Sequence, residues 1–388
     1  MVRQILKDSL KRGAVQVVRR PMYVLMIIIM PLLCCFALIN MLSKGTIQRV
    51  PVGIVDLDNS DVSRRLQRNL GAFQQVDIRE NFTSFADARD AVQRGRVLGF
   101  FYIPQDFQAE LMAGRQPKVS YYINYAYYAP GSMQYKGFKT ISIMAGGAVV
   151  QTALRTVGLR DEQITPQLLP YANYVHMPGN PWINYNYYLN ASFVPCFLSL
   201  FILMVTAFAL GTELKSGLSR QWLHTAGDNI FIAVCTKLLP HTILFTVVGW
   251  AIQWLMYVVY EFPLHCSPLV MILSMPLLVI ANQAFAVMAF CVVPNFRFGT
   301  TVVTLLGMLS FSFCGFSLPS ESLYPWIAPI GYLMPIKYYF MISCDQALNG
   351  IPLYFSRYYF AALIAFVLLP LPLLWRLKRE ASNPVYIP

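Results

Sequence analysis

The chain has 388 residues, of which 56% are hydrophobic and 12% are charged, and its formal net charge is +12. Soluble domains average about 25% charged residues, so this chain has too few charges to solvate the surface of an ordinary globular protein. Disorder is excluded as well, because disordered chains have low hydrophobicity. The composition therefore predicts a membrane protein with several spans.

Apolar runs long enough to cross a bilayer recur along the chain. They lie at residues 22–42, 192–210, 230–260, 268–293, 298–318 and 358–375. The first run is too long for a typical signal peptide and no small-residue cleavage site follows it, so we interpret it as a retained span. In the last run we expect Pro370 and Pro372 to kink the helix. Six spans place both ends of the chain on the same side of the membrane.

The basic residues indicate which side that is. Residues 1–21 carry six Lys or Arg side chains and one Asp, and the tail at 377–388 follows Arg376 and begins with further basic residues. Positively charged flanks stay in the cytoplasm, so both ends are predicted to be cytoplasmic. Residues 1–21 also alternate apolar and basic positions at helical spacing, which predicts an amphipathic helix lying on the inner leaflet.

The segment 43–190 differs from the rest of the chain. It holds 15 Lys/Arg and 11 Asp/Glu, or 26 charged residues in 148, whereas the other 240 residues hold 22. Strand and helix signals alternate along residues 50–124, with strands expected at 50–55, 75–79, 97–103 and 119–124. A mostly apolar helix over 131–158 is too short in its uncharged part to span, so we expect it to pack on this domain. The predicted fold is a polytopic α-helical membrane protein with six transmembrane helices and an inserted α/β extracytoplasmic domain.

Motifs for catalysis, nucleotide binding or metal binding are not recognisable. The segment 131–140 comes nearest to a phosphate-binding loop, but its Gly-Lys-Thr elements are not contiguous. Asp56 and Asp58 favour turn and helix capping over calcium binding, since the rest of a calcium loop is missing. Cys266 and Cys344 are both expected on the outer side and could pair, although two unlinked thiols are favoured. No metal, cofactor or nucleic acid is therefore expected to bind this chain, whose positive charge reflects its topology.

The predicted cytoplasmic loop 211–229 has an amphipathic pattern. Its apolar stripe consists of Leu214, Leu218, Trp222 and Leu223, while Glu213, Lys215 and Arg220 stay polar. Such a stripe can lie on lipid or insert into a groove of a partner protein, and the residues alone leave both alternatives open.

Several local matches make the whole chain resemble the permease subunits of ABC type-2 exporters that carry a large external domain. Segments 50–65 (VPVGIVDLDNSDVSRR) and 97–107 (VLGFFYIPQDF) are similar to two elements of that domain. The pairs Asn180-Pro181 and Val194-Pro195, and the segments 335–339 (PIKYY) and 349–350 (Asn-Gly), stand where the family has related motifs. The family's E-x-x-x-G-x-x-x-Q-x-L coupling segment is matched by Glu213, Gly217, Gln221 and Leu223, with Leu218 where threonine is usual.

The resemblance implies a function and a set of partners. It implies a permease of an ATP-driven exporter in the bacterial cytoplasmic (inner) membrane, with a coupling helix at 211–229 and an outer re-entrant hairpin at 319–357. A separate ABC ATPase subunit would bind ATP and magnesium, so this chain would not itself be an enzyme. The ATPase-coupling residues would be Glu213, Leu214, Gly217, Leu218, Arg220, Gln221, Trp222 and Leu223. A second permease protomer is implied, and some relatives use a periplasmic adaptor and an outer-membrane channel.

Polar and aromatic residues within the spans are further candidates. Lys237 and His241 are four residues apart and share one helix face, either lining a cavity or dimer interface or, for Lys237, reaching the inner headgroups. Phe311 and Phe313 could contact an apolar substrate, although helix packing is the simpler interpretation.

Two other functional classes remain compatible with the residues. A membrane-anchored interaction protein would act through its external α/β domain, and an ion channel would conduct without an ATPase. Few charges lie within the spans, which speaks against a channel. The sequence does not identify the transported molecule, although aromatic and apolar spans suit an amphipathic or lipid-like small molecule.

Overall fold

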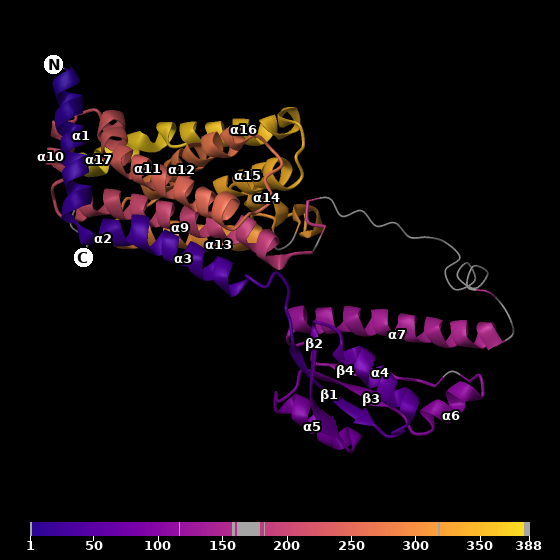
Figure 1. Ribbon diagram of the computed structural model, residues 1–388. Coiled ribbons are helices and arrows are strands. Elements are labelled where there is room, and N and C mark those ends of the chain that lie inside the picture. Colours follow the sequence, from indigo (N-terminus) through magenta and orange to yellow (C-terminus); the bar gives the residue numbers. More distant parts are fainter. Residues whose placement is uncertain are drawn as a thin grey trace. The chain divides into compact units, whose positions relative to one another are not determined.

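The computed structural model describes residues 2–115, 117–156, 160, 179–181, 183–316 and 319–383. The chain forms two compact units (Figure 1). We call residues 1–45 and 177–388 the membrane unit and residues 46–176 the inserted domain. The segment predicted at 43–190 contains this inserted domain, whose bounds are narrower, and its extracytoplasmic location stays a prediction.

Six helices of the membrane unit are long and apolar enough to cross a bilayer, counting only the described residues. They span Pro21–Met41, Tyr185–Lys215, Ile230–Val259, Pro268–Val292, Phe296–Phe313 and Leu353–Ser382. The first contains α2 (Pro21–Val24) and α3 (Met30–Met41), and the next four contain α9 (Tyr185–Lys215), α11 (Ile230–Trp254), α12 (Pro268–Val292) and α13 (Phe296–Phe313). The last contains α16 (Leu353–Leu368) and α17 (Leu374–Ser382), separated by a short 3₁₀ turn at Leu371–Leu373. The six predicted spans are thus confirmed as helices.

The interruption of the last span falls where two prolines were expected to kink it. Pro370 and Pro372 flank Leu371, and neither can donate a backbone hydrogen bond to the preceding turn. The last helix consequently breaks between α16 and α17, as predicted.

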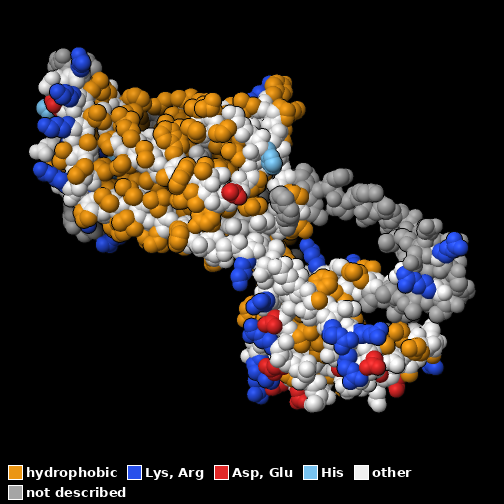
Figure 2. All heavy atoms as spheres, in the orientation of Figure 1, with side chains coloured by type: hydrophobic (Ala, Val, Ile, Leu, Met, Phe, Trp, Pro, Cys, Tyr) orange, Lys and Arg blue, Asp and Glu red, His pale blue; other side chains and the backbone are white. Residues whose placement is uncertain are grey.

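α9 is the central helix of the membrane unit. It packs against α3, α12 and α13, and 72% of its most apolar stretch of 18 residues is buried. The outer faces of the bundle stay apolar, and Figure 2 shows hydrophobic side chains covering the visible face of the bundle. Lys and Arg side chains gather at the end that carries α1 (Val2–Arg19), α10 (Ser219–Thr225) and α17 (Figures 1 and 2). The first and last helices therefore share one end of the bundle.

The inserted domain is built on a four-stranded sheet in the order β2-β1-β3-β4. Its strands are β1 (Val50–Asp56), β2 (Val76–Phe82), β3 (Gly99–Ile103) and β4 (Ser120–Ile123). β1 pairs in parallel with β2 and β3, and β4 is antiparallel to β3. All four strands were predicted within a few residues of these bounds.

Helices cover both faces of this sheet. α4 (Asp61–Gly71) and α7 (Tyr128–Thr156) pack on one face and α5 (Phe85–Gln93) on the other, while α6 (Phe107–Met112) follows β3. Right-handed connections from β1 through α4 to β2, and from β2 through α5 to β3, require opposite faces for these two helices. α7 buries Ile141 with Val52 and Phe101, which confirms that this helix packs on the domain.

Side chains at the ends of these elements serve structural roles. Ser60 and Ser84 cap α4 and α5 by accepting backbone hydrogen bonds from Ser63 and Asp87. The carboxylate of Asp56 accepts backbone bonds from residues 58 and 59, and Asp58 accepts one from Gln108. Turn and helix capping is therefore what the two aspartates do.

Candidate functional site

The connection between the second and third spans differs from the helix predicted at 211–229. α9 continues to Lys215, so Glu213 and Leu214 belong to the end of the second span. A turn at 216–218 follows, in which Gly217 has φ = 69°, a left-handed conformation that glycine adopts without steric cost. α10 then begins at Ser219, lies at the end of the bundle that carries α1, and carries Arg220, Gln221, Trp222 and Leu223. The prediction of one amphipathic helix over the loop is wrong, because the loop is an elbow between two helices.

Glu213 lies at the centre of a buried polar cluster. Its side chain is 3% exposed. The Nη2 atom of Arg12 lies 2.8 Å from Oε2, and the Nζ atom of Lys237 lies 2.6 Å from Oε1. Gln16 donates to Oε1 at 2.8 Å and accepts from Lys237 Nζ at 2.7 Å. We call Arg12, Gln16, Glu213 and Lys237 the Glu213 cluster, and it ties α1, α9 and α11 together.

The interpretation that Lys237 reaches the inner headgroups is wrong. Its side chain is 3% exposed and its ammonium group points into the Glu213 cluster, 5.8 Å from the centre of the Trp222 ring. A lysine inside a span costs about 2.5–3.5 kcal/mol to insert unless it finds a partner, and the Glu213 carboxylate is that partner. The lysine thus fixes α11 to the end of α9.

His241 lies one turn further along α11 and is 1% exposed. Its Nδ1 atom is 3.1 Å from the carbonyl oxygen of Lys237, and its ring packs edge-on against Tyr23 with 4.9 Å between ring centres. Its Nε2 atom has no hydrogen-bond partner among the described residues. Both His241 and Lys237 are enclosed by helices of this chain, so their side chains offer no surface to a second protomer.

The apolar stripe predicted for the coupling loop is mostly internal. Trp222 and Leu223 are 2% and 4% exposed, and the indole Nε1 of Trp222 donates to the carbonyl oxygen of Ala233 at 3.2 Å. Leu214 is half-buried, and only Leu218, at 41%, is clearly exposed. Two of the four stripe residues therefore bind α10 to its own bundle, and neither lipid nor a partner protein can reach them.

The surface that α10 leaves exposed is polar. Gln221 and His224 are exposed, and Arg220 is exposed while donating to the carbonyl oxygen of Ser382 at 2.7 Å and to Asn383 Oδ1 at 3.2 Å. These bonds attach α10 to the end of α17. Together with Leu218 at the elbow, the three side chains form what we call the α10 surface.

α1 also packs on the bundle. Ser9, Gly13 and Val17 form its buried face, and the hydroxyl groups of Ser9 and Thr236 are 2.6 Å apart. Leu6 and Leu10, two of the apolar residues predicted to contact the inner leaflet, are about 40% exposed. A position at the membrane surface stays a prediction, but one side of α1 is occupied by α11.

Phe311 and Phe313, the two candidate residues of the fifth span, are half-buried. Phe311 lies with its ring centre 4.9 Å from that of Phe197 on α9, so helix packing accounts for it. Phe313 is half-buried at the end of α13, and a substrate contact there stays a prediction.

The predicted outer hairpin contains two short helices, α14 (Ala328–Tyr332) and α15 (Pro335–Ile342). Lys337 on α15 is 1% exposed, donates to Ser320 Oγ at 2.5 Å and lies 3.6 Å from the centre of the Tyr332 ring. Cys266 and Cys344 are both free thiols. In the part of the chain that the structure describes, no three His, Cys, Asp or Glu side chains gather as metal ligands would.

Arg12 and Gln16 are the site residues that sequence reasoning missed. Their spacing of four residues on a helical segment was visible, but the positive charges of that segment were all assigned to lipid headgroups. A carboxylate at the end of a span, as at Glu213, requires a cationic partner, and that requirement could have directed attention to Arg12.

Comparison with known proteins assigns the family. No curated protein matches the chain. The sequence profile of the ABC-2 family transporter proteins matches residues 21–376, from the start of the first span into the last one. This match covers most of the chain, including five of the six candidate spans in full and most of the sixth. The chain therefore belongs to the ABC-2 transporter family.

Proposed function

We propose that this membrane transport component is the permease subunit of an ATP-driven exporter. A separate ABC ATPase would dock on the α10 surface and supply ATP hydrolysis. The observation that carries the proposal is the elbow between α9 and α10, which is locked to the bundle from two sides by Trp222 and the Glu213 cluster. Because the elbow is held rigidly, a displacement of α10 would be transmitted almost fully to α9, the central helix.

The proposed cycle follows from these connections. Closure of the ATPase would displace α10, and the rigid path through α9 and α11 would shift the spans toward an outward-open state. Cargo affinity must differ between the two states for the cycle to export. We propose an amphipathic or lipid-like small molecule as cargo, a second permease protomer completing the pathway, and a bacterial inner-membrane location with both ends in the cytoplasm. An envelope-spanning assembly with an adaptor and an outer-membrane channel would extend the same function.

The α10 surface provides a direct test, because its side chains are exposed and can be changed without opening the core. The double variant Leu218→Ser/Gln221→Ala should lower co-purification of the partner ABC ATPase by tenfold or more. The matched control is Trp326→Ala, which removes a side chain that is 75% exposed on the segment leading to α14. Undiminished ATPase association in the double variant would contradict the docking assignment and favour a membrane-anchored protein that acts through its inserted domain.

A further inference from the structure

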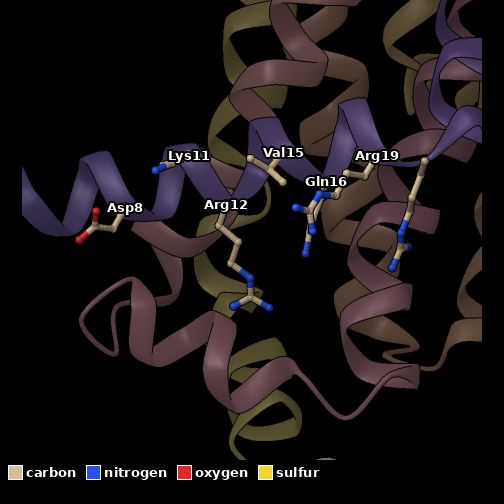
Figure 3. Close-up of a pocket in the computed structure, with 7 residues that line it drawn as sticks. Asp8, Lys11, Arg12, Val15, Gln16 and Arg19 are labelled. Carbon is tan, nitrogen blue, oxygen red and sulfur yellow. The ribbon is translucent and has the colours of Figure 1, made fainter.

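A hollow on α1 collects positive charge beside the Glu213 cluster. Its volume is about 530 Å³. The residues that line it are Asp8, Lys11, Arg12, Val15, Gln16, Arg19 and Arg20. Four cationic side chains thus face one carboxylate, an excess of +3. In Figure 3 the side chains of Arg12 and Arg19 extend to the same side of α1, two turns apart.

The hollow is preorganised on one side. Arg12 and Gln16 are held in place by hydrogen bonds to the buried Glu213 carboxylate. Among the described residues, Lys11, Arg19 and Arg20 form no ion pair. The donors of Lys11 and Arg19 remain available to an anion, and Arg20 also contacts the Tyr23 hydroxyl with part of its guanidinium. Guanidinium groups match the oxygens of a phosphate with two hydrogen bonds each.

The surroundings of the hollow indicate what kind of anion it receives. Arg20 is followed directly by Pro21, the first residue of the first span, so the hollow lies where the chain enters the membrane. Val15 and Val18, on neighbouring turns of α1, are 38% and 80% exposed. A soluble anion would gain nothing from these apolar side chains, whereas a lipid would cover them with its acyl chains.

We propose that the hollow binds the headgroup of one anionic phospholipid. Arg19, Arg20 and the outer face of Arg12 receive the phosphate, Lys11 faces the rest of the headgroup, and the acyl chains run along Val15 and Val18. The same guanidinium of Arg12 touches Glu213, so the bound lipid stabilises α1 against the end of α9. This site requires only that the chain sits in a membrane and does not depend on which cargo or ATPase it serves.

Lipid binding to the full-length chain tests the proposal. The purified protein in a neutral detergent is titrated with dioctanoyl phosphatidylglycerol, dioctanoyl phosphatidylcholine or inorganic phosphate, and binding is counted by native mass spectrometry. Phosphatidylglycerol should saturate at one molecule per chain. The variant Arg19→Gln/Arg20→Gln should weaken this binding about 25-fold, since each basic residue near an anionic headgroup contributes about fivefold.

A matched variant distinguishes specific binding in the hollow from general electrostatic attraction of the lipid to the basic helix α1. Arg3→Gln/Lys7→Gln removes two charges from the same helix outside the hollow and should change binding less than about twofold. Lys11→Gln removes one lining charge and should weaken binding about fivefold even if the double variant folds poorly. Equal losses in the two double variants would overturn the proposal, as would equal binding of the two lipids. Displacement of phosphatidylglycerol by equimolar inorganic phosphate would overturn the assignment to lipid.

Discussion

Glu213 shows how much a single residue's role depends on its neighbours. The family pattern placed it on a surface helix that contacts an ATPase, whereas the structure buries it between Arg12 and Lys237. Glu213 therefore joins three helices, and the role proposed for it in coupling would depend on these contacts. Removing one member of a buried ion pair leaves the other charge uncompensated, which is more damaging than removing both.

This difference predicts the effect of substitution. Glu213→Ala should lower the free energy of unfolding by about 3–5 kcal/mol, because Lys237 is left charged and buried. Glu213→Ala/Lys237→Met should be more stable than the single variant. Denaturation in mild detergent, followed by size-exclusion chromatography, measures both. If the double variant lost as much free energy of unfolding as the single variants Glu213→Ala and Lys237→Met lose together, the two residues would not be coupled.

The thiols of Cys266 and Cys344, which both lie outside the spans, have a predictable reactivity. Burial, with a smaller contribution from the negative charge of Asp345, raises the pKa of Cys344 to about 12, and burial also raises the pKa of Cys266. Because only the thiolate reacts, Cys344 should be alkylated slowly by iodoacetamide at pH 8, with a rate rising about tenfold per pH unit. Mass spectrometry of folded and denatured protein measures the two rates. A peptide cross-linked between Cys266 and Cys344 would contradict the free thiols.

At the scale of elements, the contact between α1 and α11 depends on the absence of a side chain at Gly13. A Cβ atom there would lie 3.0 Å from the carbonyl oxygen of Thr236 and 3.3 Å from Lys237 Cα. The backbones approach so closely that Ser9 and Thr236 share a hydrogen bond. A larger residue must push α1 away and take Arg12 with it.

Gly13→Leu should therefore detach α1 from α11. In a Ser9→Cys/Thr236→Cys background, oxidation should form a cross-link between the two helices, which mass spectrometry detects as a linked peptide. Gly13→Leu should abolish this cross-link, whereas Ala14→Leu, on the exposed side of the same helix, should preserve it. Cross-linking that survives Gly13→Leu would show that the close approach is unimportant.

Local signals were sufficient to predict most elements. Ser60 and Ser84 marked the starts of two helices, alternating apolar residues marked the strands, and uncharged runs marked the spans. These features depend on neighbours in sequence, so a single sequence displays them. Gly217 also marked the end of α9 and could have shortened the predicted coupling helix.

Tertiary partners were the part that sequence could not supply. An apolar pattern reports that Trp222 and Leu223 need burial but does not say whether their cover is lipid, another protein or α11. In the same way, a lysine within a span requires a partner, yet nothing local to Lys237 identifies Glu213, 24 residues earlier. The location of the coupling site along the chain therefore stays a prediction, while the exposed and buried sides of its residues were assigned wrongly.

At the scale of the whole molecule, the arrangement of its ends limits the possible topologies. α1, α10 and α17 lie at one end of the bundle, which carries the basic side chains (Figure 2). One candidate span, Pro21–Met41, separates α1 from the inserted domain along the chain, so we predict that the two lie on opposite sides of the membrane. Positive charges near span ends favour the cytoplasm, and this predicts a cytoplasmic α10 surface and an external inserted domain.

Labelling with a membrane-impermeant maleimide tests this orientation. Asn69→Cys introduces a thiol on the exposed side of α4 in the inserted domain, and Gln221→Cys introduces one on the α10 surface. In intact spheroplasts the first variant should be labelled and the second should not, because only external thiols meet the reagent. After the membrane is disrupted, both should be labelled to a similar extent, and the unsubstituted chain provides the background from its own cysteines. Labelling of Gln221→Cys alone in intact spheroplasts would reverse the orientation and remove the α10 surface from the reach of any cytoplasmic ATPase.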